Sequence, residues 1–183
     1  ISVFNTVTVT VTGTNDQPVA GDVAIAALED GIAVTGNFAV TDADTTDTHT
    51  FAITSALGAG EGSVLNNNDG TFTFNPGTDF QDLADGESRD VTFTYTARDD
   101  SSTGNDTSVF NTVTVTVTGT NDDPVITIGA GSAAETLTET DAGLTVADTL
   151  TLTDIDTTNI VTSTVLSVFE SGTASGIANA TLL

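Results

Sequence analysis

Two Asp-x-Asp motifs carry the side chains of this protein that are best suited to bind an ion. Asp42 and Asp44 form the first motif, with Asp47 close behind it, and Asp154 and Asp156 form the second. Residues two apart face the same side of a strand, and at a strand end or in a turn both carboxylates can converge on one cation. The spacing therefore predicts a bound cation, with a solvated turn as the alternative.

Calcium fits this oxygen-rich setting best, because it takes six to eight oxygen ligands at about 2.3 to 2.6 Å and tolerates irregular geometry. Magnesium is less suited, and zinc would depend on a lone histidine, His49, since there is no cysteine. His49 itself is expected to be a strand residue or a salt-bridge partner. The segment is not an EF-hand, because position six from Asp42 is Asp47 and position twelve is Ile53.

Two short linkers carry a second set of oxygen ligands. Their sequences are Asn15-Asp16-Gln17-Pro18 and Asn121-Asp122-Asp123-Pro124. Proline fixes φ and cannot continue a sheet ladder, so each junction is predicted to be short and stiff. The Asn and Asp side chains offer oxygens at the boundary between neighbouring units, although both residue types also form ordinary turns.

A tandem repeat organises these motifs. The stretch Ser2–Asp16 returns letter for letter at Ser108–Asp122, an offset of 106 residues. This period divides the chain into the final strand of a preceding repeat (1–13), a complete repeat (14–119) and an incomplete following repeat (120–183). A unit of this length can bury its own core, and repetition favours a long structural protein over a catalyst.

The secondary-structure pattern is β throughout. Valine alternates with threonine, as expected for strands with one buried face. Strands are expected around residues 7–11, 23–28, 32–40, 50–53, 72–74, 91–95 and 113–117. A tight hairpin is expected at Asn68-Asp69-Gly70 and one helical turn around Phe80 to Leu83. About seven short strands per unit indicate an all-β sandwich of two sheets.

The charge balance limits the partners. There are 26 acidic residues against two arginines and no lysine, which gives a formal net charge of -24. Such a chain has too few positive charges to neutralise a phosphate backbone, so nucleic acid is excluded as a partner. An acidic membrane surface is disfavoured as a partner for the same reason. No apolar run approaches the ~20 residues that span a bilayer, so no direct membrane insertion is expected. Solubility or adaptation to salt is the alternative explanation of the acidity; otherwise a divalent cation must relieve the repulsion.

An enzyme is not expected. Nucleophilic catalysis would depend on His49 alone, which lies on a predicted strand. Glycoside hydrolysis would lack aromatic side chains for sugar rings, because there is no tryptophan and only one tyrosine, Tyr95. The sequons that begin at Asn105 and Asn179 permit N-linked glycans if the source has the machinery, and the abundant threonine leaves O-linked glycans open as the alternative. The threonine ladders also fit an ice-binding face, but β-propensity and solubility explain them more simply.

The string from Phe80 through Asp100, followed by VTVTVTGTND-P, resembles the VCBS-type and cadherin-like repeats of giant secreted bacterial adhesins of the RTX kind. The resemblance implies tandem Ig/cadherin-like Greek-key β-sandwich repeats that bind calcium and contact neighbouring repeats of the same chain or adjacent subunits. It also implies an extracellular or bacterial cell-surface location, with roles in cell adhesion and biofilm formation.

The resemblance further implies which residues bind calcium at each seam, meaning the boundary between two successive repeats. The seam after the complete repeat would use Glu29, Asp99, Asp100, Asn121, Asp122, Asp154 and Asp156. The seam before it would use Asn15, Asp16, Asp42 and Asp44. The last unit departs from the pattern, because Glu139-Thr140-Asp141-Ala142-Gly143 replaces the Glu29-Asp30-Gly31 turn.

Two functions are consistent with these features. In the first, the repeats form a calcium-rigidified spacer that holds a terminal binding domain away from the cell. In the second, the chain is a subunit of an extracellular filament, in which residues 1–13 insert as a donated strand into the incomplete unit of the next subunit.

Overall fold

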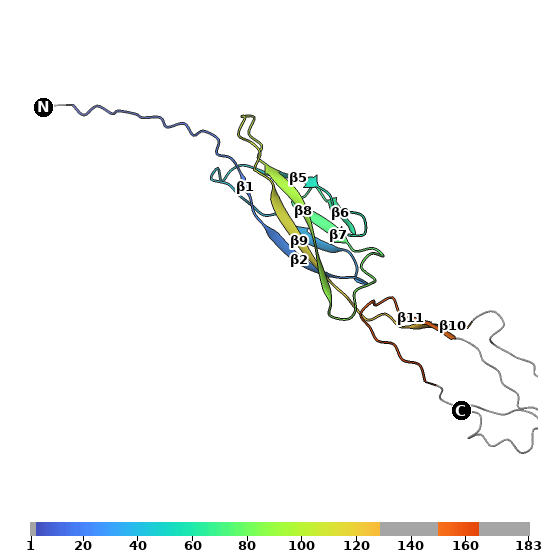
Figure 1. The fold of residues 1–183 in the computed structure, drawn as a ribbon. Helices are drawn as coiled ribbons and strands as arrows, with labels where there is room; N and C mark the ends of the chain where they lie inside the picture. Colours follow the sequence, from blue (N-terminus) through green and yellow to red (C-terminus); the bar gives the residue numbers. More distant parts are fainter. Residues whose placement is uncertain (1–2, 129–149, 165–183) are drawn as a thin grey trace, which may run out of the picture. The chain divides into compact units, whose positions relative to one another are not determined.

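The computed structural model describes residues 3–128 and 150–164 of the chain (Figure 1). The chain divides into two units, Ile1–Asn121 and Asp122–Leu183, which are considered separately below. The turn expected at residues 139–143 and the sequon at Asn179 lie outside the described residues.

A four-stranded sheet forms one layer of the first unit (Figure 1). Its order is β2 (Val23–Leu28), β9 (Asn111–Thr118), β8 (Ser88–Arg98) and β5 (Thr50–Ser55). β9 lies between β2, to which it is parallel, and β8, to which it is antiparallel. β5 is antiparallel to β8, with an irregularity between Ile53 and Ser55.

A three-stranded antiparallel sheet forms the second layer. Its order is β3 (Val34–Asn37), β7 (Thr71–Asn75) and β6 (Ser63–Asn66), and a short pair joins β1 (Val19–Ala20) to β4 (Val40–Thr41). The β6–β7 connection is the expected hairpin, where Asn68 and Gly70 have φ values of 61° and 90°. The expected all-β sandwich is therefore confirmed.

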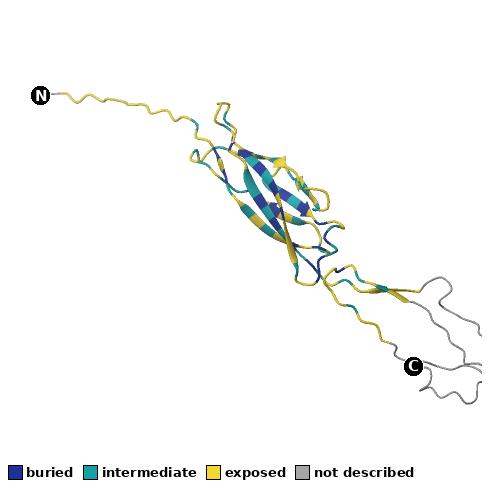
Figure 2. Ribbon diagram, viewed as in Figure 1, coloured by how far each residue is buried: buried dark blue, intermediate teal, exposed yellow. Residues whose placement is uncertain are grey.

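Buried residues recur along the strands of the first unit (Figure 2). The core that they form is rich in aromatic side chains. Phe72 and Phe74 of β7 face Phe93 and Tyr95 of β8, and all four side chains are buried. The Phe72 and Phe93 rings meet edge to face with centroids 5.2 Å apart, a favoured arrangement for aromatic pairs. Alternate residues of β8 and β9 are buried, as the period-two pattern requires.

Tyr95 also ties the β1–β4 pair to the sheet through its hydroxyl group. Its Oη lies 2.8 Å from the Ala39 carbonyl oxygen and 2.5 Å from that of Gly21, and it accepts a hydrogen bond from Ala39 N at 3.1 Å. Burial raises the pKa of Tyr95, so the hydroxyl keeps its proton as a hydrogen-bond donor.

Three expectations about local structure need correction. The strand expected at residues 7–11 is absent, because residues 3–18 lie outside strands and Val7, Val9 and Val11 are exposed. The identical sequence at 113–117 forms β9, since it has β2 and β8 as hydrogen-bonding neighbours. The helical turn expected around Phe80 to Leu83 is instead a non-helical turn, because Phe80 has a φ of 72° and Leu83 N donates to Phe80 O at 2.9 Å. The short strands β1 and β6 were not expected.

In the second unit, β10 (Val125–Ile128) and β11 (Leu150–Thr153) pair as an antiparallel ribbon. Val125 and Ile126 follow the linker proline directly, as a strand that begins at once after a stiff junction should.

Within the described ranges there is no helix long and apolar enough to cross a membrane.

Gly36 should be indispensable for the contact between β3 and the core. A Cβ atom at this position would lie 2.9 Å from Phe72 Cε1, which is too close for two carbon atoms. The Phe72 ring is buried in the core and has little room to move away. Gly36→Ala is therefore expected to lower the free energy of unfolding by about 1–3 kcal/mol in urea titrations. Gly104→Ala is the matched control, because nothing lies within 4 Å of its Cβ position. Equal stability of the two variants would contradict this packing.

Candidate metal centres

Three carboxylates of the first unit converge near the linker that precedes it. Oxygen atoms of Asp42, Asp47 and Asp99 all lie within 4.8 Å of one another, and these three residues are called the first acidic cluster. Two oxygens on opposite sides of a calcium ion are about 4.6 to 5.2 Å apart, so the spacing suits one ion. Asp99 is buried and the other two are half-buried.

The Asp-x-Asp motif adopts a defined turn between β4 and β5. Asp42 Oδ1 accepts a hydrogen bond from Asp44 N at 2.9 Å, and Asp44 O accepts one from Asp47 N at 3.0 Å. The first of these bonds is an Asx turn, which an aspartate forms with the backbone two residues on. The turn places Asp47 beside Asp42, so the motif is more than a solvated loop.

The linker is held against this turn by its own backbone and side chains. Asp16 N donates to Asp44 Oδ2 at 2.7 Å. Asn15 Nδ2 donates to Asp99 Oδ2 at 3.1 Å and to Asn105 O at 3.0 Å. The structure therefore brings together four of the residues assigned by motif to the seam before the complete repeat, namely Asn15, Asp16, Asp42 and Asp44.

His49 is the partner of one cluster carboxylate. Its Nε2 lies 2.9 Å from Asp42 Oδ2, within hydrogen-bond distance of that carboxylate. This hydrogen bond, followed by the one from Asp44 N, lowers the pKa of Asp42. Asp42 is therefore ionised at neutral pH, as a cation ligand must be.

The two remaining carboxylates have opposite pKa shifts. Burial raises the pKa of Asp47, and the negative charges of its neighbours, Asp100 and Asp44 first, raise it further. Burial also raises the pKa of Asp99, but hydrogen bonds from Asn15 and Ser101 outweigh this effect and leave the pKa below its usual value. The cluster thus holds negative charge under mutual repulsion, which a divalent cation would relieve.

The expectation that Asp99 and Asp100 serve the seam after the complete repeat is wrong. β8 is antiparallel to β9, with Ser88 opposite Thr118, so residues that follow β8 lie at the end of the sheet where β9 begins. Asp99 accordingly meets Asn15. Asp100 lies outside the cluster, and its carboxylate accepts hydrogen bonds from Thr48 N at 3.3 Å and Thr48 Oγ1 at 3.0 Å.

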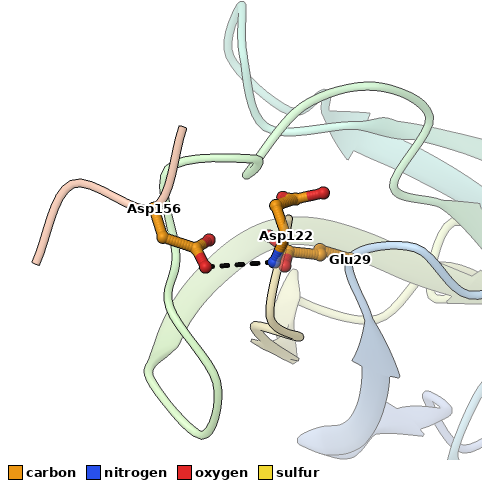
Figure 3. Close-up of side chains that lie close together, drawn as sticks. All are labelled: Glu29, Asp122 and Asp156. Carbon is orange, nitrogen blue, oxygen red and sulfur yellow. Dashed lines mark hydrogen bonds between the residues drawn. The ribbon is translucent and has the colours of Figure 1, made fainter. Parts of the chain in front are cut away.

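The second Asp-x-Asp motif repeats the same hydrogen bonds within the second unit. Asp154 Oδ1 accepts from Asp156 N at 3.1 Å, and Asp156 O accepts from Asn159 N at 3.1 Å. Asp156 Oδ2 accepts from the linker Asp122 N at 3.0 Å (Figure 3). Asp156 is buried, and among the described residues its Oδ1 has no hydrogen-bond partner. A buried carboxylate oxygen in this state fits a cation.

Glu29 lies at the opposite end of the first unit from the first acidic cluster. β2 is parallel to β9, so Glu29 follows β2 at the end where β9 runs into the linker. Its side chain is fully buried, and its Oε1 accepts a hydrogen bond from Thr120 N at 2.6 Å. Glu29 is thus bonded to Thr120, the residue that directly precedes the linker Asn121.

Two residues were missed by the sequence assignment. Asp47 belongs to the first acidic cluster, and Asn159 occupies the corresponding place after Asp156. The available signal was their common spacing, because each lies three residues after the second Asp of its motif.

Comparison with known proteins places this geometry in a family. A family model described as a bacterial cadherin-like domain matches residues 15–119, which is more than half of the chain. The solved structure of cadherin domains 1–4 of protocadherin gamma B7 is similar, with 20% sequence identity and a TM-score of 0.42. The match covers 63% of this chain and 27% of that chain. A nucleoside hydrolase-related protein from Saccharophagus degradans matches with 17% identity, 57% and 26% coverage, and a TM-score of 0.38. The chain thus spans about a quarter of each structure, and no curated protein matches.

The raised pKa of Asp47 leads to a prediction for the metal-free protein. Because its pKa is higher in the folded chain than in the unfolded chain, ionisation of Asp47 opposes folding once the pH exceeds the unfolded value. In chelator at pH 7, Asp47→Asn should therefore raise the melting temperature, and the gain should vanish below about pH 4. Asp85→Asn, at an exposed loop position, is the control. A lower melting temperature for Asp47→Asn at pH 7 would refute the repulsion.

Proposed function

Because the chain belongs to the bacterial cadherin-like domain family, we propose that it is a non-catalytic, calcium-binding extender repeat of a large bacterial adhesin, located outside the cell. The observation that carries the proposal is the recurrence of one arrangement in both units. In each, the backbone N–H of the linker aspartate binds the second carboxylate of an Asp-x-Asp turn. A turn that merely needed solvation would have no reason to bind the linker in the same way twice.

The first acidic cluster supplies the oxygen ligands that calcium requires. Asp42, Asp47 and Asp99 offer up to six carboxylate oxygens, and Asp16 and Asp44 lie next to them in the same hydrogen-bonded turn. When bound, the ion would supply positive charge that screens these acids. The chain's own residues orient the ligands, because Asn15 holds Asp99 and His49 holds Asp42.

We assign a second calcium site to the second unit, where the linker residue Asp122 meets Asp156 of the second Asp-x-Asp motif. Glu29 binds Thr120 N within the first unit, and Asp122 N binds Asp156 within the second. Asp154 belongs to the same motif as Asp156 and would contribute to this site.

The proposed function is mechanical. Without calcium, carboxylates at each seam repel one another and the short linker bends. With calcium at the ~10⁻⁴ to 10⁻³ M at which extracellular modules commonly bind, the seams stiffen. Binding would thus stiffen the array after export, since the ion concentration inside a cell is far lower.

The exposed segment 3–13 supports an array of such units, as in the VCBS-type adhesins. Its sequence from Asn5 to Thr12 is that of β9, which in the first unit has neighbours on both sides. In an array we assign this segment to the last strand of the preceding repeat. A repeat with strands of about 10 residues spans roughly 35 Å, so reach across a cell envelope requires many copies.

Loss of one cluster carboxylate should weaken calcium binding selectively. Asp99→Asn keeps the shape of the side chain but removes a charge from a buried ligand, so the affinity of the first site should fall by about tenfold or more in calorimetric titrations. Asp85→Asn should leave the affinity unchanged, because Asp85 is exposed and lies in neither cluster. Identical titrations of the two variants would exclude the first acidic cluster as a calcium site.

Calcium should also narrow the range of orientations between the two units. Small-angle scattering of the full chain is expected to show a narrower distribution of dimensions in calcium than in chelator. Asp156→Asn should abolish this difference, because Asp156 joins the linker backbone to the second proposed site. Asp99→Asn is the matched control and should retain the difference, since Asp99 lies at the other end of the first unit. Dimensions that do not change with calcium would refute the stiffening.

A further inference from the structure

The outward surface of the four-stranded sheet is almost uncharged, although the chain carries a net charge of -24. In β8 and β9, the residues between the buried ones are mainly threonine, and Ala24 and Ala26 of β2 are exposed. This surface, the outer threonine face, is defined by residues Ala24, Ala26, Thr92, Thr94, Thr114 and Thr116. Among the outward-facing residues of these four strands, only Asp90 and Arg98 are charged.

These two charges have a self-complementary arrangement. Asp90 and Arg98 lie on β8 with Thr94 midway between them, and all three point away from the core. Two copies can meet face to face about a twofold axis that lies in the contact plane, perpendicular to β8, and passes Thr94. This axis would place Asp90 of each copy opposite Arg98 of the other copy. The threonine ladders of the two copies would then meet in the middle.

We propose that the outer threonine face binds a second copy of this chain face to face, with the two β8 strands antiparallel. Two copies repel one another over most of their acidic surface, and this face is where they can approach without repulsion. The argument depends only on the first unit and stands apart from the calcium sites of the proposed function.

The geometry of the side chains agrees with this pairing. The Arg98 guanidinium donates to Asp106 Oδ2 through Nε at 2.9 Å and Nη2 at 2.6 Å, and Nη1 takes no part in these two bonds. Asp90 Oδ1 accepts from Thr116 Oγ1 at 2.6 Å, which orients the carboxylate on the face. The Thr54 and Thr94 hydroxyls are hydrogen-bonded to each other at 2.8 Å, so these two groups in the middle of the face already have a partner.

The size of the face predicts weak association that gains strength from repetition. Eight residues of β8 span about 27 Å and four strands about 19 Å, so the face covers roughly 500 Å². A stable interface takes about 800 Å² per partner, so a single pair should dissociate readily. Arrays of repeats would multiply such contacts through their effective concentration.

The test uses charge reversal and sedimentation of the full chain in calcium and moderate salt, at about 10 µM to about 1 mM. Asp90→Arg should weaken self-association by about tenfold or more, because Arg then faces Arg, and Arg98→Asp should do the same. An equimolar mixture of these two variants should associate again, since every pair across the axis becomes complementary. Asp85→Arg makes the same change in net charge away from the face and should not weaken association.

Four results would overturn the proposal. The first is a monomer at every concentration, as expected if the threonine ladders instead contact a surface such as ice. The second is association that Asp90→Arg changes no more than the control, as head-to-tail strand donation would give. The third is a mixture of the two variants that fails to associate although both fold by circular dichroism. The fourth is undiminished association of Thr94→Glu, which places two negative charges at the axis.

Discussion

The position of β9 between β2 and β8 is the constraint on which the rest of the structure depends. Its parallel ladder with β2 fixes Glu29 at the end of the sandwich where the chain leaves. Its antiparallel ladder with β8 fixes Asp99 at the end where the chain enters. One uncharged Val-Thr strand therefore decides which acids gather at which linker. β9 ends at Thr118, so the chain reaches the linker residue Asn121 within three residues of the sheet.

The sequence pattern predicted which residues are buried in strands, but it did not predict whether neighbouring strands run parallel or antiparallel. Alternation of Val, Phe and Tyr with Thr located β7, β8 and β9, and Asn68-Asp69-Gly70 located the hairpin. Alternation does not say whether neighbouring strands are parallel, so Asp99 was assigned to the wrong end. The segment at 7–11 shows the same limit, because strand propensity has no effect on structure without a neighbouring edge. Asp47 was missed because its role depends on a turn that folds it back onto Asp42.

Both arginines of the chain form ion pairs with aspartates that lie outside the first acidic cluster. Arg89 binds Asp82 at 2.6 Å and Arg98 binds Asp106 at 2.6 Å, and the sequence has no lysine. His49 is therefore the sole remaining side chain that can carry positive charge, and it contacts Asp42 only through Nε2. The acids at the linkers are balanced by nothing else in the chain, so their charge must be met from solution. In the proposed function, this imbalance is the reason that the stability of the seams would respond to a dissolved cation.

Charge is unevenly distributed within the first unit, which has acidic turns and a nearly uncharged outer threonine face. Acids gather in the turns that follow strands, where chain ends and linkers meet, while the outward positions of β8 and β9 are mostly threonine. A strand rich in acids on its outer face would repel its neighbours across the sheet, since directly opposed like charges destabilise a ladder. Threonine avoids that cost and still suits a strand. The requirement for a stable central ladder thus produces a neutral face between two acidic ends, and the same sequence choice would separate the proposed ion sites from the proposed contact with a second chain.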